Sequence, residues 1–264
     1  MCGEGIDIII PTRNGGQTLL RTLTALAAQV APRDRVHVVL NGCIDDSVAA
    51  AGAGLVLVRE KGAHGAIIEC AAAGRPSALT AGDAAATGDR VYLDHDVILS
   101  DGGLALIRSA LRGGADFACG EARWRTPSPW VRSAMNAWNR LPYVCDGRVT
   151  AGMFAVSKSG RLRWTAWPGQ LPDDKWARIH FRPSERVRIP ELYYSVAAPA
   201  TFSGLVEIRR RYNRSNRALA AAEPVRLADD VPRSRGLTAF ALDPRQAPGS
   251  LILAAAELTA RMRP

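Results

Sequence analysis

Two aspartates on either side of a histidine give the strongest local signal for chemistry in this sequence of 264 residues. Asp94, His95 and Asp96 follow the run Arg90–Leu93, which predicts a strand. Because side chains alternate across a strand, the two carboxylates should share one face and His95 should lie on the other. Such a pair suits Mg²⁺ or Mn²⁺, with phosphates and water completing the coordination. The alternative interpretation is an acidic strand end that caps the next helix.

A second acidic pair, Asp173 and Asp174, follows Pro172, where a helical pattern begins. A carboxylate here could take a proton from a nucleophile as a general base. Two acidic side chains at the start of a helix also complement its dipole, so the pair has a structural explanation as well.

Basic residues gather in a helical pattern that spans about 203–222. On such a helix, Arg210, Arg214 and Arg217 would lie on one face. They could hold a diphosphate or an anionic acceptor, or they could form an ordinary solvated face. Arg75 could reach a phosphate too, or it could cap a turn.

Strand-like and helical patterns alternate through the first half of the chain. Thr18 is expected to cap the first helix, and Pro76 opens a later one. This alternation predicts an α/β fold with a parallel sheet covered by helices, in which ligands bind beyond the carboxyl ends of the strands. The apolar runs are Ile6–Ile10, Val36–Leu40, Gly54–Val58, Arg90–Leu93 and Asp116–Cys119.

The second half contains all six tryptophans. Most of them should be core residues, although one could stack on the ring of a bound acceptor substrate. A strand is expected at Val149–Val156, and an amphipathic helix around 250–261 ends the chain. With 47% hydrophobic residues, the chain can fill a sizeable core.

Composition limits the partners and the compartment. The net charge of +9 favours anionic partners without choosing among them. Five scattered cysteines form no CxxC pair, no apolar run reaches the roughly 20 residues that span a bilayer, and no signal peptide is evident. We therefore expect a cytoplasmic protein, with peripheral attachment to a membrane as an option.

Through most of Ile6 to Leu219, the chain resembles the family 2 glycosyltransferases, which have the nucleotide-sugar-binding GT-A fold. Six segments carry the resemblance in the family's order, and none of them contains the GxGxxG of a dinucleotide site. The segments are Ile8–Asn14, Val38–Ser47, Gly74–Gly82, Ala85–Asp96, Pro172–Trp176 and Arg210–Arg214.

The resemblance implies roles for individual residues. Asp94 and Asp96 would bind Mg²⁺ or Mn²⁺, and Asp174, or less favourably Asp173, would be the catalytic base. The implied donor-binding residues are Pro11, Thr12, Arg13, Asn14, Asn41, Arg75, Asp94, His95, Ala151, Gly152, Arg210, Arg211 and Arg214.

Several positions depart from the family pattern, among them Thr80, where Asn is common. Leu40 and Asn41 stand where two acidic residues are common, one of which reads the base. Asn41 can still bond to a base edge, but Leu40 cannot, which weakens the expectation of uridine. Asp173 replaces a usual Glu.

We therefore predict a single GT-A domain over 1–222, with a nucleotide-sugar half (1–120), an acceptor half (121–222) and a C-terminal extension (223–264). It would transfer a sugar from a nucleotide-diphosphate donor, with UDP as the expected nucleotide, in a metal-dependent and inverting reaction. The acceptor would be a small molecule, a lipid head group or a carrier-borne intermediate, as in natural-product biosynthesis. Because the chain is basic, an anionic acceptor or an acidic carrier protein is a candidate partner.

Two other functions stay open at this point. A sugar nucleotidyltransferase would also use paired carboxylates and Mg²⁺, although Arg13-Asn14-Gly15-Gly16 is a poor version of its glycine-rich loop. A nucleic-acid-binding module would fit the charge, but the interior carboxylates argue against it and few aromatic residues interleave with the arginines, so we expect no nucleic-acid partner.

Overall fold

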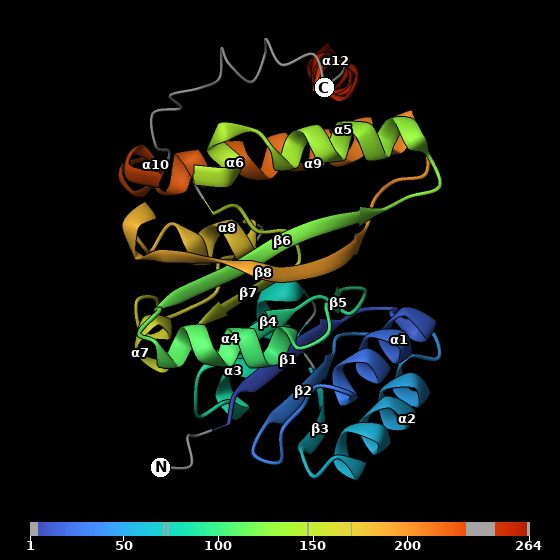
Figure 1. Ribbon diagram of the computed structural model, residues 1–264, viewed down its shortest axis with the longest axis vertical. Coiled ribbons are helices and arrows are strands. Elements are labelled where there is room, and N and C mark those ends of the chain that lie inside the picture. The colour runs from blue at the N-terminus through green and yellow to red at the C-terminus, as the bar shows by residue number, and fades with distance from the viewer. Residues whose placement is uncertain are drawn as a thin grey trace.

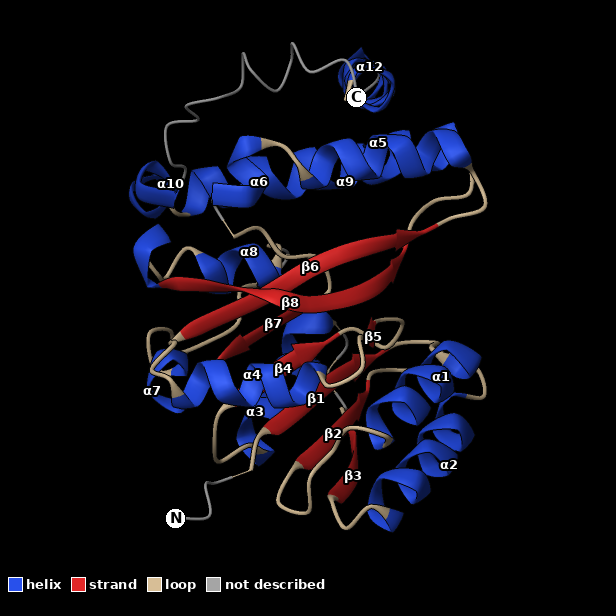
Figure 2. Cartoon of the chain, in the orientation of Figure 1, coloured by secondary structure: helices blue, strands red, loops and turns tan. Residues whose placement is uncertain are grey.

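The computed structural model describes residues 5–70, 72, 74–146, 148–169, 171–230 and 246–262. Its centre is one eight-stranded sheet with the strand order β3-β2-β1-β4-β7-β6-β8-β5 (Figure 1). Helices cover the sheet, and a further group of helices lies across one end of the molecule (Figure 2). This arrangement confirms the α/β class that the alternating patterns predict.

The first half of the chain builds the parallel part of the sheet. Strands β1 (Asp7–Thr12), β2 (Arg35–Leu40), β3 (His64–Glu69) and β4 (Arg90–Leu93) pair in parallel. Their connections are α1 (Gly16–Ala27), α2 (Ser47–Glu60) and α3 (Arg75–Ala85).

The second half makes the sheet mixed. Its strands are β5 (Ile98–Leu99), β6 (Phe117–Arg125), β7 (Met153–Val156) and β8 (Arg186–Ala197). Strand β7 runs antiparallel to both β4 and β6, while β6 and β8 are parallel. The register between β6 and β8 shifts between Cys119 and Glu121. Glycine suits the position between them, because any Cβ at Gly120 would lie 2.5 Å from the Leu192 carbonyl oxygen.

Each face of the sheet has its own core. Alternation along β1 sends Ile8 and Ile10 into the core under α1, α2 and α4 (Gly103–Arg112), and sends Ile9 into the core under α3. The second core is aromatic, with Tyr92 stacked on Phe154 at a centroid distance of 4.8 Å. The strands that carry the site are therefore anchored on both sides.

A third core holds the end layer of helices together. It joins α5 (Pro129–Asn139), α9 (Phe202–Ala222) and α12 (Ala247–Met262), so the terminal helix packs into this layer (Figure 1). No helix within the described ranges is long and apolar enough to cross a membrane. The shorter helices are α6 (Pro142–Asp146), α7 (Lys158–Arg161), α8 (Asp173–Arg178), α10 (Pro224–Asp230) and the 3₁₀ turn η1 (Pro183–Glu185).

Three local predictions from the sequence are wrong. Gly54–Val58 lies inside α2, since Ala50, Ala51 and Leu55 repeat with a helical period; the strand follows at β3. Thr18 lies within α1, whose first amides, from Gly15 and Gly16, donate instead to the Ser47 hydroxyl at 2.8 and 3.0 Å. The strand expected from Val149 begins only at Met153.

Candidate active site

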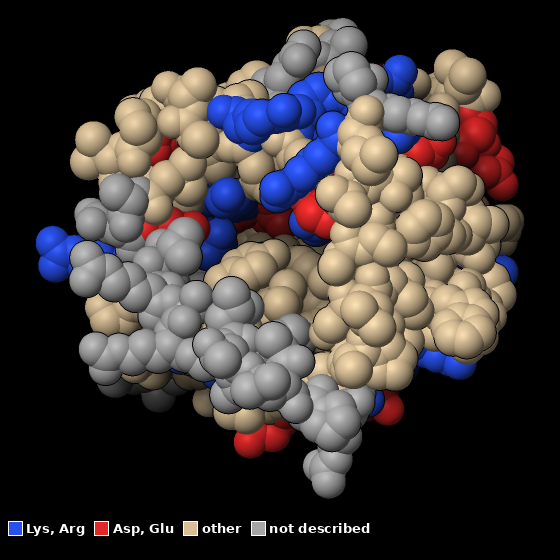
Figure 3. Space-filling model, turned by 90° about the horizontal axis from the view of Figure 1, so that it is seen from above, with Lys and Arg blue, Asp and Glu red and all other residues tan. Residues whose placement is uncertain are grey.

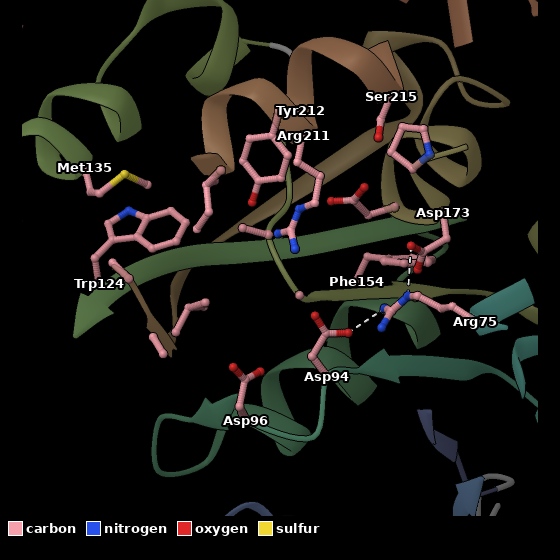
Figure 4. Close-up of a pocket in the computed structure, with 18 of the residues that line it drawn as sticks. Arg75, Asp94, Asp96, Trp124, Met135, Phe154, Asp173, Arg211, Tyr212 and Ser215 are labelled. Atoms are coloured by element: carbon pink, nitrogen blue, oxygen red, sulfur yellow. Dashed lines mark hydrogen bonds and ion pairs between the residues drawn. The ribbon is translucent and has the colours of Figure 1, made fainter. Parts of the chain in front are cut away.

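A cavity of about 450 Å³ separates the parallel part of the sheet from the helices of the end layer. Arg75 and Asp94 reach it from the segments that follow β3 and β4, and α8 and α9 supply its other side (Figure 4). The carboxyl ends of parallel strands are where ligands bind in such sheets, as the sequence predicts. The cavity gathers Asp94, Asp96, Asp173 and Asp174 in one place.

Asp94 and Asp96 lie in a turn and not in a strand. Strand β4 ends at Leu93, and the Val97 amide donates to the Asp94 carbonyl at 3.1 Å, which closes the turn. The predicted strand alternation is therefore wrong, yet the turn brings both carboxylates to the cavity (Figure 4). His95 does not line it; its ring packs against Gly15, where an added Cβ would lie 2.9 Å from His95 Cδ2.

Arg75 joins the two acidic motifs. At the start of α3, its Nη2 lies 2.5 Å from Asp94 Oδ1 and its Nε lies 3.0 Å from Asp173 Oδ1 (Figure 4). Partial desolvation at the cavity disfavours the charge of Arg75, but Asp94 and Asp173 outweigh this effect and raise its pKa. Burial also raises the pKa of Asp94, and Arg75 opposes that shift. A fixed cation therefore lies between the two pairs of carboxylates.

Asp96 is the carboxylate best suited to receive a cation. Within the described ranges, its carboxylate accepts no hydrogen bond and forms no ion pair, although it lines the cavity. No three His, Cys, Asp or Glu side chains of the described residues come together as a complete metal site. A donor set of one or two carboxylates fits Mg²⁺ or Mn²⁺, whose coordination shell is commonly completed by substrate phosphates and water. It does not fit a structural zinc site.

Asp174 has the environment of a base. Its Oδ1 accepts a hydrogen bond from the Lys175 amide at 2.7 Å, and its Oδ2 lies 3.4 Å from the Thr150 hydroxyl. Burial, followed by the charge of Asp173, raises the pKa of Asp174 to about 6. Asp173 and Asp174 do lie in the first turn of α8, where their charges complement the helix dipole. A dipole interaction alone, however, would not raise the pKa of a carboxyl group.

Ala151 and Gly152 form the wall beside the acidic turn, as the family resemblance implies. Gly152 has a φ of 80°, and a Cβ at this position would lie 3.0 Å from Asp94 Oδ2. A side chain here would therefore displace the carboxylate. The Ala151 amide donates to the Tyr194 hydroxyl at 3.2 Å, which fixes the approach to this wall.

Asn41 is turned toward the backbone of the neighbouring loop. Its amide nitrogen donates to the Ala72 carbonyl at 2.8 Å, and its oxygen accepts from the Gly74 amide at 2.8 Å. With the residue only 4% exposed, these bonds hold the segment that leads into Arg75. In this geometry Asn41 positions the loop instead of presenting its amide to a base.

The other expected nucleoside residues lie along the end of β1 and outside the 450 Å³ cavity. Pro11 and Thr12 are buried, whereas Arg13 and Asn14 are exposed. The Asn14 side chain accepts a hydrogen bond from the Ile44 amide at 2.9 Å, which joins this loop to the segment after β2.

Helix α9 presents different residues on two faces. Ile208, Arg211, Tyr212 and Ser215 line the cavity (Figure 4). The expected common face of Arg210, Arg214 and Arg217 lines a separate groove together with Arg261. Seen from above, Lys and Arg side chains gather along one rim of a hollow (Figure 3). Of the three arginines with a predicted donor role on this helix, only Arg211 reaches the cavity.

Sequence reasoning missed several lining residues. Ser215 lies one helical turn beyond Arg211, so the helical period could have identified it. Met135, Val196 and Pro199 come from other elements and carry no comparable signal.

The sequence matches the family model described as Glycosyl transferase family 2 over residues 7–171. The chain belongs to this family. It is therefore a glycosyltransferase that uses nucleotide-sugar donors, which replaces the nucleotidyltransferase alternative. No curated protein sequence matches the chain.

Solved structures of GT-A glycosyltransferases share the fold. The mannosyltransferase PcManGT from Pyrobaculum calidifontis, in complex with GDP-Man and Mn²⁺, is 14% identical with a TM-score of 0.67; the match covers 98% of this chain and 75% of that one. TarS 1–349 from S. aureus, with UDP-GlcNAc, is 11% identical with a TM-score of 0.56, covering 98% and 92%. Glucosyl-3-phosphoglycerate synthase from Mycobacterium tuberculosis, with phosphoglyceric acid, is 16% identical with a TM-score of 0.54, covering 88% and 82%.

Proposed function

We propose that this glycosyltransferase is metal-dependent, inverts the anomeric carbon and takes its sugar from a UDP-sugar. One observation carries the proposal: a single cavity holds the acidic turn, the cation of Arg75 and the carboxyl of Asp174 with its pKa of about 6. Such a cavity can bind a diphosphate at one side and a nucleophile at the other. Structural neighbours in complex with UDP-GlcNAc, with UDP, and with GDP-Man and Mn²⁺ lend support for the donor class.

The donor side would be formed by the acidic turn and by arginines. Asp96, assisted by Asp94, would hold Mg²⁺ or Mn²⁺, which neutralises the charge of a leaving diphosphate. Arg75 and Arg211 line the same cavity and would bind phosphate oxygens with charge-assisted hydrogen bonds. Gly152 would leave room for the sugar beside Asp94.

The acceptor side would be formed by Asp174. As the acceptor hydroxyl or amine attacks the anomeric carbon, a new bond forms from its oxygen or nitrogen to that carbon, and the bond to the donor's phosphate oxygen breaks. The nucleophile's proton passes to Asp174 Oδ2, and the nucleotide diphosphate leaves. A single displacement of this kind inverts the configuration. Asp173 would stay paired with Arg75 and orient it.

The arginine groove of α9 suggests a partner for the acceptor. Arg210, Arg214, Arg217 and Arg261 line a groove separate from the cavity. A negatively charged carrier that bears the acceptor, such as an acidic carrier protein, would be attracted to this surface. The donor would remain in the cavity on the other face of the helix.

A screen of nucleotide sugars by thermal unfolding tests the donor proposal. UDP-glucose, UDP-GlcNAc and GDP-mannose would each be added with Mn²⁺ or with a chelator. Ligand at ten times its dissociation constant stabilises the folded chain by about 1.4 kcal/mol, so we expect one UDP-sugar to raise the Tm by about 3–5 °C with Mn²⁺ only. Equal shifts with the chelator would contradict metal dependence, and no shift with any donor would contradict the proposed site.

A further inference from the structure

A second pocket, of about 140 Å³, adjoins the cavity at the candidate base. Asp174, Ala151 and Tyr212 line both spaces, so a molecule that reaches Asp174 can extend into either. Part of the remaining wall of the smaller pocket comes from the end layer of helices, with Leu205 on α9 and Leu253 on α12. The pocket is therefore continuous with the acceptor side of the site.

Two tryptophans give the pocket an aromatic wall. Trp124 and Trp138 meet edge to face, with their ring centroids 5.6 Å apart. Their indole N–H groups donate to Asn139 Oδ1 at 2.8 Å and to the Tyr143 hydroxyl at 3.1 Å. Because these polar atoms already have partners, the wall offers a ligand mainly apolar ring surface.

The cations that line the pocket also have partners. Lys175 donates to Asn216 Oδ1 at 2.9 Å, Arg178 pairs with Asp230 at 3.0 Å, and Arg209 pairs with Glu257 at 2.9 Å. Because Asp230 and Glu257 offset the charges of the two arginines, a phosphate or carboxylate entering here would meet less uncompensated positive charge. The chemistry of the pocket thus differs from that of the cavity, where Arg211 lines the wall and forms no ion pair with a described residue.

We propose, on the basis of the function proposed above, that this pocket binds an apolar group of the acceptor, of the size of one six-membered ring. An apolar cavity of about 150 Å³ in another protein takes up benzene, which sets the scale. The acceptor is then an alcohol or amine whose nucleophile lies beside Asp174 while an aromatic or alicyclic group fills the pocket. A phosphate group gains little from such an apolar wall, so a phosphorylated sugar fits the pocket less well.

Cyclohexylmethanol is a suitable probe, and ethanol is its small polar counterpart. Each buried methylene strengthens binding about fourfold, so the full chain should bind cyclohexylmethanol at least tenfold more tightly than ethanol in saturation-transfer NMR titrations with Mg²⁺ and UDP present. Leu253→Trp should fill the pocket and weaken probe binding at least tenfold. Leu253→Ala, which removes part of the wall, should weaken it several-fold. Leu251→Trp is the matched control, since Leu251 is 70% exposed on the same helix.

The outcomes separate this inference from the function on which it rests. The nucleotide affinity of each variant is measured by calorimetry with UDP and Mg²⁺. If UDP binds but cyclohexylmethanol binds no better than ethanol, or binds Leu253→Trp as well as the wild type, the apolar acceptor pocket is refuted while the donor site stands. If the probe binding depends on Leu253 but UDP does not bind, the proposed function fails, and the pocket loses its role in the transfer.

Discussion

Asp173 accepts a hydrogen bond from Arg75 Nε at 3.0 Å. The two adjacent carboxylates therefore have different surroundings, because Asp173 is paired with Arg75, which also pairs with Asp94. Asp174 is left facing both the cavity and the apolar pocket.

The first prediction concerns the base. Asp174→Asn preserves the size of the side chain and can keep the bond from the Lys175 amide, but it cannot accept the acceptor's proton. General base catalysis typically contributes about 10²–10⁴-fold, so kcat should fall by that order while donor affinity barely changes. Asp173→Asn should lower kcat by a smaller factor. Normal turnover by Asp174→Asn beside a dead Asp173→Asn would show that the other aspartate is the base.

The pH profile gives a second test of the base. Asp174 must be ionised to accept a proton, and its pKa is about 6. We expect kcat/KM to rise about tenfold per pH unit below pH 6 and to level off above it. Because the charge of Asp173 helps to raise this pKa, Asp173→Asn should move the acid limb to lower pH. An acid limb that Asp173→Asn leaves in place would argue against Asp174 as the titrating group.

The free energy of unfolding should depend on the protonation of Asp174. Its pKa is raised from 3.8 to about 6, so the ionised form is disfavoured in the folded chain. The cost is absent well below pH 4, where the group is protonated in both states, and is fully present well above pH 6. Asp174→Asn should therefore stabilise the chain by about 1–3 kcal/mol at pH 8, and this gain should vanish at about pH 3. Urea unfolding of both forms, with the exposed Asp101→Asn as the control, measures it; a gain that does not change with pH would refute the shift.

Salt should reveal the role of the arginine groove. Surface attraction is screened over about 8 Å at physiological ionic strength, so the KM for a carrier-borne acceptor should rise at least twofold between 50 and 300 mM salt. Arg214→Glu and Arg217→Glu should raise the KM at low salt and flatten its salt dependence. Arg112→Glu, on an exposed part of α4, is the matched control. A KM that is flat with salt in the wild type would exclude an anionic carrier at this groove.

Much of the parallel half of the sheet could be predicted from the sequence, because buried strands such as Val36–Leu40 are continuous apolar runs. Strand β3 was missed because it is an edge strand with exposed residues such as His64, and the apolar run before it belongs to a helix. Strand β8 was missed because charged residues interrupt it, among them Arg188 and Glu191.

The site was predictable where its residues are close in sequence, as for Asp94 with Asp96 and Asp173 with Asp174. The ion pairs of Arg75 could not be predicted, since they depend on how β4 and α8 pack together. The apolar pocket could not be predicted either, because it too depends on tertiary packing. Its wall combines Trp124 and Leu253, which lie on elements far apart in the chain and meet only when the end layer of helices is assembled.

The central claim is a metal-dependent site for a nucleotide diphosphate, and Asp96 tests it most directly. The measurement is calorimetry of UDP binding, with Mn²⁺ and with a chelator, to the wild type, Asp96→Ala and the exposed control Asp101→Ala. We predict that Mn²⁺ strengthens UDP binding at least tenfold in the wild type and in the control. In Asp96→Ala the metal-dependent part should be lost although the fold is kept, because this carboxylate has no other partner among the described residues. Asp94→Ala should lose a smaller part of the metal-dependent UDP affinity. An unchanged affinity in Asp96→Ala with Mn²⁺ would contradict the account.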